Sequence, residues 1–281
     1  MSEILVTGAT GNVGRHIVSQ LLATGTAVRA LARDPESAGL PTGAEVVGGD
    51  LSRPDTLEGA LTGSDTVFLI WPFLTTEGAP AVLEAMARHV RRVVYLSSSG
   101  VTEDAERQTD PINQLHADME RLIEKSGLEW TVLRSDTIAS NARGWAEQIR
   151  TTRIVRGPDI AATAVIHEQD VAAVAVHALT DDGHTGAQHV LTGPQVLSRA
   201  QQVRTIGEAI GRPTRFEKVP LEVARAQMLA DGRPLALVEA LLGSAATRPE
   251  SNVITTTVEE ITGTPARTFR SWADEHADVF R

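Results

Sequence analysis

Three glycines spaced three residues apart, Gly8, Gly11 and Gly14, follow a short apolar run near the start of the chain. Residues 4–6 predict a buried strand, and apolar residues recur with helical period over residues 17–22, so the glycines lie where a strand turns sharply into a helix. A turn without Cβ atoms lets backbone N–H groups and the positive end of a helix dipole approach a pyrophosphate closely. The alternative interpretation is a tight turn that binds nothing.

Arg33 follows the second predicted strand, which spans residues 27–32. In dinucleotide-binding folds this strand tip faces the adenosine ribose, where an acid binds the hydroxyls of NAD and an arginine suits the 2′-phosphate of NADP. Arg33 therefore predicts NADPH as the cofactor. The alternative is a solvated arginine before a helix start, because Asp34 beside it is also placed to reach a ribose.

Polar and aromatic residues follow the third and fourth predicted strands. Asp50 comes shortly after residues 45–47 and is predicted either to contact adenine or to cap the next turn. Trp71 and Phe73 end a continuous apolar run, at the edge where open α/β sheets bind ligands. Their rings are predicted either to wall a flat substrate or the nicotinamide, or to pack within the loop.

Composition excludes several classes of site. The chain has 281 residues and a net charge of −10, which argues against binding nucleic acid through its phosphates. It contains no cysteine, so disulfides, thiolate catalysis and zinc–thiolate sites are excluded, and we expect no metal. The N-terminus enters a strand by residue 4, and no apolar run approaches ~20 residues. We therefore expect a cytoplasmic protein with no signal peptide and no membrane partner.

The order of the predicted elements indicates an α/β fold with a doubly wound parallel sheet. Strands at 4–6, 27–32, 45–47, 66–71, 93–96 and 129–134 alternate with helical patterns, joined by short connections.

Past residue 140 the pattern loosens into short strands and helices, including a predicted strand over residues 160–167 and a helix over residues 170–179 capped by Asp170. Ser198 and Gln201 form a capping box that opens a further helix. Residues 264–265 are predicted to cap a terminal helix that Phe269, Trp272 and Phe280 dock. We predict a dinucleotide-binding domain over residues 1–150 and a smaller, mostly helical substrate lobe over 151–281, some of whose strands return to the sheet.

Several motifs together resemble the extended and atypical short-chain dehydrogenase/reductases, most closely the NmrA-like branch. They are Gly-Ala-Thr-Gly-Asn-Val-Gly at 8–14, Gly-Asp-Leu at 49–51, Tyr-Leu-Ser-Ser-Ser-Gly at 95–100, Glu-Trp-Thr-Val-Leu-Arg at 129–134 and His-Glu-Gln-Asp-Val-Ala at 167–172. The resemblance covers nearly the whole chain. It implies a Rossmann fold that binds NAD(P), with a C-terminal lobe closing over the substrate. Members include quinone, ketone and dye reductases, and redox-sensing regulators that bind a dinucleotide without turnover.

The resemblance also assigns roles to single residues. It places Ser99 at the catalytic serine and His116 among the groups near the cofactor and the reaction. The predicted substrate-facing residues are Asn141, which the resemblance covers, and the aromatic residues Phe73 and Trp145, which indicate a lined pocket. The cofactor contacts it implies are Gly8, Thr10, Gly11, Asn12 and Val13 at the pyrophosphate turn, Arg33 at the 2′-phosphate, Asp50 and Leu51 at adenine, Ile70 and Trp71 at the nicotinamide ribose, and Ser97 and Ser98 along the backbone.

One departure from the family pattern concerns the proton. Members normally protonate the product alkoxide with a tyrosine whose pKa is lowered by a lysine four residues later. Tyr95 is the only tyrosine of this chain, and Ser99 stands four residues after it. In the alignment that the resemblance implies, Ile112 takes the tyrosine position and His116 the lysine position. His116 is then either a candidate acid or a helix residue that only touches the ribose or solvent.

A missing acid favours particular substrates. Hydride addition to a quinone yields a delocalised phenolate, and a ketone beside its own phenol draws a proton internally, so neither needs a strong enzymic acid. We therefore expect an NADPH-dependent ketone or quinone reductase acting on a small aromatic, polycyclic substrate. Polyketide ketoreductases of this branch in antibiotic biosynthesis, such as that of the simocyclinone pathway, fit the same pattern. The alternative is a dinucleotide sensor without turnover, and the oligomeric state stays open.

Overall fold

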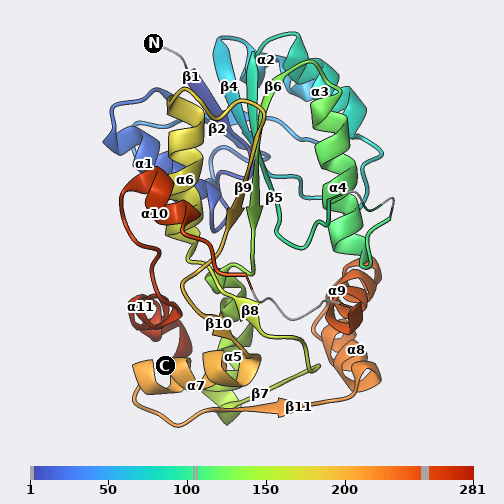
Figure 1. Ribbon diagram of the computed structural model, residues 1–281, viewed down its shortest axis with the longest axis vertical. Helices are drawn as coiled ribbons and strands as arrows, with labels where there is room; N and C mark the ends of the chain where they lie inside the picture. Colours follow the sequence, from blue (N-terminus) through green and yellow to red (C-terminus); the bar gives the residue numbers. More distant parts are fainter. Residues whose placement is uncertain (1–2, 104, 106, 248–252) are drawn as a thin grey trace.

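The computed structural model describes residues 3–103, 105, 107–247 and 253–281. A seven-stranded sheet with helices on both faces forms its upper part in Figure 1, which confirms the predicted doubly wound α/β class. Each neighbouring pair of strands is parallel. In spatial order the strands are β3 (Glu45–Gly48), β2 (Val28–Ala32), β1 (Glu3–Val6), β4 (Ser64–Leu69), β5 (Arg92–Ser98), β6 (Glu129–Ser135) and β9 (Ala187–Leu191).

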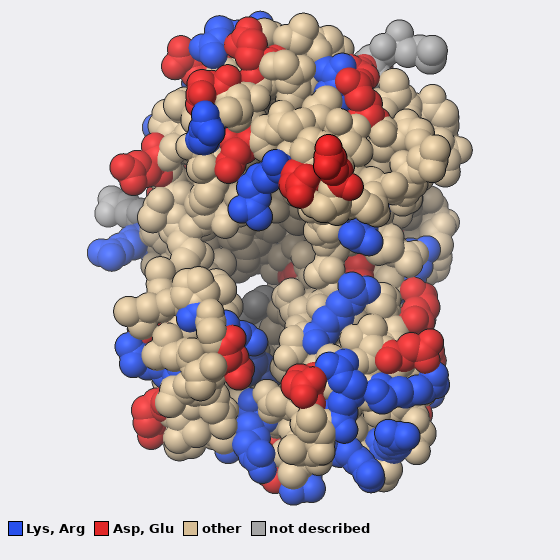
Figure 2. Space-filling view, turned by 180° about the vertical axis from the view of Figure 1, so that it is seen from behind, with Lys and Arg blue, Asp and Glu red and all other residues tan. Residues whose placement is uncertain are grey.

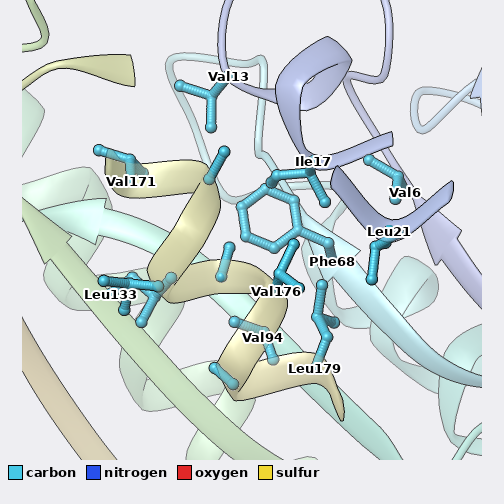
Figure 3. Packing of buried hydrophobic residues seen from close by; sticks show 14 of the residues in the cluster. Val6, Val13, Ile17, Leu21, Phe68, Val94, Leu133, Val171, Val176 and Leu179 are labelled. Atoms are coloured by element: carbon cyan, nitrogen blue, oxygen red, sulfur yellow. The ribbon is translucent and has the colours of Figure 1, made fainter. Parts of the chain in front are cut away.

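Two hydrophobic cores hold the helices against the sheet. On one face, α1 (Gly14–Ala23) and α6 (Glu168–Thr180) pack around Phe68 of β4, as Figure 3 shows. On the other face lie α2 (Glu58–Leu61), α3 (Ala79–Ala87) and α4 (Pro111–Glu124), with the short 3-10 helix η1 (Pro54–Thr56) before them. The inner strands read as continuous apolar runs because both of their faces are covered.

The lower part of Figure 1 is a lobe with its own core around Trp272, Phe269 and Phe280. These three aromatic residues dock the end of the chain, as the sequence predicted. No described helix is long and apolar enough to cross a bilayer. The lobe elements are η2 (Ala139–Trp145), α5 (Ala146–Thr152), β7 (Ile154–Gly157), β8 (Thr163–Ala164), β10 (Val196–Leu197), α7 (Arg199–Ala209), β11 (Arg215–Lys218), α8 (Leu221–Ala230), α9 (Leu235–Thr247), α11 (Phe269–Glu275) and η3 (Ala277–Phe280).

The chain crosses between the two parts more than once. Residue 150 lies inside α5, whose neighbours η2 and β7 also belong to the lobe. After β8 the chain returns to the sheet as α6 and β9, and α10 (Thr257–Thr262) packs on both. The two parts are therefore interleaved along the sequence, and the strand predicted over residues 160–167 is only the two-residue β8.

Three predicted helix starts have different outcomes. The capping box of Ser198 and Gln201 is confirmed at the start of α7. Asp170 was expected to cap α6, but His167 Nδ1 accepts the cap hydrogen bond from the Gln169 N–H, and the Asp170 carboxylate binds Arg267 instead. The predicted cap at residues 264–265 is also wrong, because α11 starts later and Thr268 caps it. At α6 a tertiary ion pair takes up the Asp170 carboxylate, whereas at α11 another local cap, Thr268, lies closer to the start of the helix.

Candidate active site

The glycine turn is built as tightly as the sequence predicted. Gly8 has a φ of 60°, in the left-handed region that glycine adopts readily. A Cβ on Gly14 would lie 2.2 Å from the Gly8 carbonyl oxygen, so helix and strand meet too closely for any other residue. Thr7 closes the turn from below, since its Oγ1 accepts from the Ile70 N–H at 2.9 Å and joins β1 to β4. Gly8 and Gly11 stay exposed to a ligand.

Free backbone donors face the open side of this turn. The N–H groups of Thr10, Asn12 and Val13 have no backbone acceptor among the described residues. No acidic side chain occupies the first turn of α1, so the positive end of its dipole is uncompensated. Val13 itself is buried and fixes the start of the helix in the core. These features fit a pyrophosphate group.

Residues at the adenosine end are divided between surface and core. Arg33 is exposed, with no ion pair to a described carboxylate, and lies close enough to help lower the pKa of Asp50. The larger cause of that lowered pKa is the Ser52 N–H, which donates to Asp50 Oδ1 at 2.8 Å. Asp50 therefore caps its own turn, as the alternative interpretation had it. The Leu51 side chain is buried in the core.

The rings of Trp71 and Phe73 pack against each other. Their centroids lie 4.9 Å apart in an edge-to-face arrangement, and Trp71 Nε1 donates to the Thr75 carbonyl at 2.8 Å. The two rings therefore pack within the loop, and neither residue lines the cavity described below. Ile70 is half-buried against Gly8 and stays beside the cofactor turn.

A cavity of about 520 Å³ lies between the carboxyl ends of the strands and the lobe. Figure 2 shows the molecule hollowed at mid-height, between its upper and lower halves. The residues predicted as functional that line this cavity come from β5, α4 and η2, and they are Ser97, Ser98, His116, Asn141 and Trp145. Ile112, at the family's tyrosine position, lines it as well.

Ser98 lines the cavity, whereas Ser99, the predicted catalytic serine, does not. The Ser98 hydroxyl donates to Asn113 Oδ1 at 2.8 Å and accepts from the Gly100 N–H at 3.1 Å. Asp110 fixes that amide by accepting from Asn113 Nδ2 at 2.5 Å. The single hydroxyl proton of Ser98 is therefore already used in a hydrogen bond to Asn113 of α4. Sequence reasoning missed Asn113 and Asp110, although the Asp-Pro start of a helix was a signal for the cap.

Ser97 belongs to a buried charged group between β5, β6 and α4. Its hydroxyl donates to Glu120 Oε1 at 2.5 Å, and Arg134 holds the same carboxylate through two hydrogen bonds of 3.1 and 2.7 Å. Glu120 and Arg134 are each about 5% exposed or less. A buried pair whose hydrogen bonds are all made fixes α4 against the sheet end. This bracing holds the face of α4 that carries His116.

Tyr95 stands directly behind His116. The two side chains are joined by a 2.8 Å hydrogen bond between the phenol oxygen and His116 Nδ1. Burial raises the pKa of Tyr95, so the phenol stays protonated. We assign its proton to the bond with Nδ1 because the described residues offer the hydroxyl no other acceptor. Burial also lowers the pKa of His116 to about 4. A neutral imidazole that accepts at Nδ1 carries its proton on Nε2, so His116 is a neutral donor near neutral pH.

The buried, neutral state of His116 predicts an acid-dependent loss of stability. Unfolded histidine binds a proton near pH 6.5, whereas His116 in the fold binds one only near pH 4. Between these values the unfolded state binds more protons, so the free energy of unfolding falls as pH falls from about 6.5 to 4. In His116→Asn this fall should be smaller than in the wild type, by urea unfolding at several pH values. If the free energy of unfolding falls equally in the variant and in the wild type, the imidazole is not buried. The control is His177→Asn, which replaces a histidine whose side chain is 39% exposed.

Several arginines close to the site carried no sequence signal of their own. Arg143 of η2 donates to Asn12 Oδ1 at 3.3 Å and so reaches the glycine turn from the lobe. Arg156, Arg199 and Arg233 line the cavity from the lobe side. Their approach depends on how the lobe folds back, which residue spacing does not reveal.

Comparisons with known proteins agree with this geometry. The sequence profile of the family described as NAD(P)H-binding matches residues 8–182. The chain belongs to this family. It binds NAD(P)H, and two relatives that match it along its whole length are reductases. A (4-alkanoyl-5-oxo-2,5-dihydrofuran-3-yl)methyl phosphate reductase of Streptomyces griseus is 40% identical over 99% of both chains, and an NAD(P)H azoreductase of Xenophilus azovorans is 32% identical over 99% of both.

Solved structures share the fold over nearly the full length. An NADPH-dependent quinone oxidoreductase of Escherichia coli superposes with a TM-score of 0.81, at 22% identity and with 97% of this chain and 98% of that one covered. A triphenylmethane reductase of Citrobacter sp. gives 0.78 at 21% identity, with 99% and 100% covered. The family and the reductase relatives make this chain an NAD(P)H-dependent oxidoreductase.

Proposed function

We propose that the chain transfers hydride from NADPH to a ketone or quinone conjugated with an aromatic system, without an enzymic general acid. The observation that carries this proposal is the neutral Tyr95–His116 pair. With Ile112 at the tyrosine position and a histidine whose pKa is about 4 at the lysine position, the α4 side of the cavity presents no charged acid. A substrate whose reduced form is a stabilised anion suits such a site.

The residues of the cavity contribute to such a reaction in different ways. Bound NADPH supplies the hydride from its nicotinamide ring. His116 offers its Nε2–H as a neutral hydrogen-bond donor, the kind of fixed dipole that stabilises developing negative charge. Tyr95 holds the imidazole in that tautomer, and Ser98 with Asn113 keeps α4 in register with the end of β5. The Trp145 ring contributes an apolar wall from the lobe.

A second acceptor class is supported by the relative that shares 40% identity. Its named substrate is a 5-oxo-2,5-dihydrofuran that carries an alkanoyl group. Hydride addition to a ring alkene conjugated with two carbonyl groups gives a delocalised enolate, which again needs no strong acid. We therefore extend the proposal to conjugated lactones. Quinone, aryl ketone and lactone share one property, which is the stability of the anion formed by hydride addition.

The direct test is NADPH oxidation against a panel of naphthoquinones, hydroxylated polycyclic ketones and acyl-substituted unsaturated lactones. We expect turnover with at least one of these classes. Tight NADPH binding with no turnover on any of them would instead support the dinucleotide-sensing alternative. Product analysis by mass spectrometry confirms that hydride reached the acceptor rather than oxygen.

His116→Ala tests the role of the histidine. A neutral hydrogen bond is worth about 0.5–1.5 kcal/mol net, so the single-turnover rate at saturating NADPH should fall about tenfold. The wild-type rate should also stay level through pH 6.5, because His116 does not titrate there. A general acid would cost 10²–10⁴-fold. A loss beyond a hundredfold with NADPH affinity intact, or a rate that falls as pH rises through 6.5, would contradict substrate-assisted protonation.

A further inference from the structure

The strongest unexplained charge in the cavity is Arg199, the first residue of α7. Its guanidinium lines the cavity, and Nη1 donates to the Pro158 carbonyl at 3.1 Å. It forms no ion pair with a carboxylate in the described part of the chain. The nearest acid in its electrostatic surroundings, Asp159, is engaged by Lys218 Nζ at 2.6 Å. Arg199 is therefore a half-buried cation whose neighbouring carboxylate is already paired with Lys218.

This placement of Arg199 is unfavourable in two separate ways. Arg199 is half-buried, and this burial lowers the pKa of its guanidinium to about 10. In addition, a cation at the start of a helix meets the positive end of the helix dipole, where acids are preferred. A half-buried guanidinium that lacks an ion pair among the described residues has lost part of its hydration without full compensation. Both penalties disappear when an anion lies against the guanidinium.

A second unpaired arginine faces the same cavity. Arg233, between α8 and α9, is half-buried and has no ion pair to any described residue, and its Nη2 lies 4.0 Å from the position of a Cβ built on Gly144. Arg156 also lines the cavity, but its Nε is bound to Glu217 at 3.0 Å. In Figure 2 the Lys and Arg side chains gather over the lower half of the molecule, beside the hollow.

The rest of the cavity separates this cationic end from the reaction end. Ser98 and His116 enter from the carboxyl end of the sheet, whereas Arg199 and Arg233 enter from the lobe at the bottom of Figure 1. Of the two carboxylates in the lining, Asp136 accepts from the backbone N–H groups of Thr137 and Ala164, and Asp231 is exposed at the end of α8. Among the described residues, Asp231 forms no ion pair with either arginine.

We propose that the lobe end of the cavity binds an anionic substituent of the hydride acceptor, a phosphate monoester or a carboxylate, through Arg199 assisted by Arg233. This rests on the proposed function in assuming that the cavity holds the acceptor. Guanidinium groups bind both anions through paired N–H donors. The substituent would anchor one end of the substrate while the conjugated group reaches the sheet end.

Calorimetry on the NADP⁺-saturated protein tests this directly, because bound NADP⁺ occupies the phosphate sites of the cofactor. The probes are phenyl phosphate, benzoate and, as the neutral control, benzyl alcohol. At least one anion should bind more than tenfold tighter than benzyl alcohol, and the tighter one identifies the anionic group. Arg199→Met should remove at least tenfold of that preference, as charge-assisted hydrogen bonds are worth roughly ten- to hundredfold.

The control is Arg225→Met, which removes an exposed, paired arginine of the same lobe and should leave all three affinities unchanged. If Arg199 serves anion binding, Arg199→Met should melt no lower than the wild type without ligand, because a partly desolvated charge has been removed. Should that variant fail to fold, Arg233→Met carries the test. Equal affinity for anions and benzyl alcohol in the wild type would overturn the proposal. Anion binding without any NADPH oxidation would leave this site intact and reject the reductase proposal instead.

Discussion

Gly14→Ala is expected to weaken NADPH binding at least about a hundredfold. The added Cβ would lie 2.2 Å from the Gly8 carbonyl oxygen and 2.8 Å from the Ala9 Cα. All of its close neighbours are backbone atoms, so the helix and the turn have to separate. The N–H groups of the turn would then no longer converge on a pyrophosphate, a loss of about 3 kcal/mol. NADPH fluorescence titration measures it.

Gly25→Ala separates this local effect from general destabilisation. Gly25 has a φ of 76° just beyond α1, with nothing within 4 Å of an added Cβ. The substitution should lower the free energy of unfolding by about 1 kcal/mol, because alanine is strained in the left-handed region, and should leave NADPH affinity unchanged. If Gly14→Ala binds NADPH as well as Gly25→Ala does, the turn is not the pyrophosphate site.

Arg33→Ala should lower NADPH affinity about ten- to hundredfold and leave NADH affinity nearly unchanged. Arg33 is exposed at the end of β2 and is not neutralised by an ion pair with a described residue, so its charge is available to the 2′-phosphate. A charge-assisted hydrogen bond to a phosphate is worth roughly 1.5–3 kcal/mol. The wild type should accordingly prefer NADPH, and added salt should reduce the preference.

Arg88→Ala is the matched control for Arg33→Ala. Arg88 is exposed directly after α3 and pairs with Glu84. Its loss changes the net charge of the protein without altering a residue at the adenosine end. It should leave both affinities as they are. Equal wild-type affinities for NADPH and NADH would show that Arg33 does not bind the 2′-phosphate.

The sheet and its cofactor turn were predictable from sequence because their signals are local. Buried parallel strands read as apolar runs, and the crowded turn between β1 and α1 permits only glycine at Gly14. The lobe was less predictable, since its short strands pair with distant segments. β7 pairs with β11 some sixty residues later, as Ile154 lies opposite Arg215, and no residue pattern within either strand shows this.

The site was predictable to a smaller extent. Ile112 and His116 do line one cavity, as their four-residue spacing on a helix required. The sequence does not indicate that Tyr95 contacts His116, because the family pattern concerns only a tyrosine and a lysine four residues apart. In the fold its phenol reaches His116 across 21 positions of sequence. The edge-to-face contact between Trp71 and Phe73 also depends on the path of the loop after β4, which the apolar run alone does not define.

The measurement that tests the central claim most directly compares two acceptors in one assay of anaerobic NADPH oxidation. Menadione yields a delocalised phenolate on hydride addition, whereas cyclohexanone yields an alkoxide that requires a proton donor. With Ile112 and a neutral His116 where the family has tyrosine and lysine, we predict turnover of menadione and none of cyclohexanone. Reduction of cyclohexanone at a rate comparable with menadione would contradict the account, because it would require a general acid in the cavity.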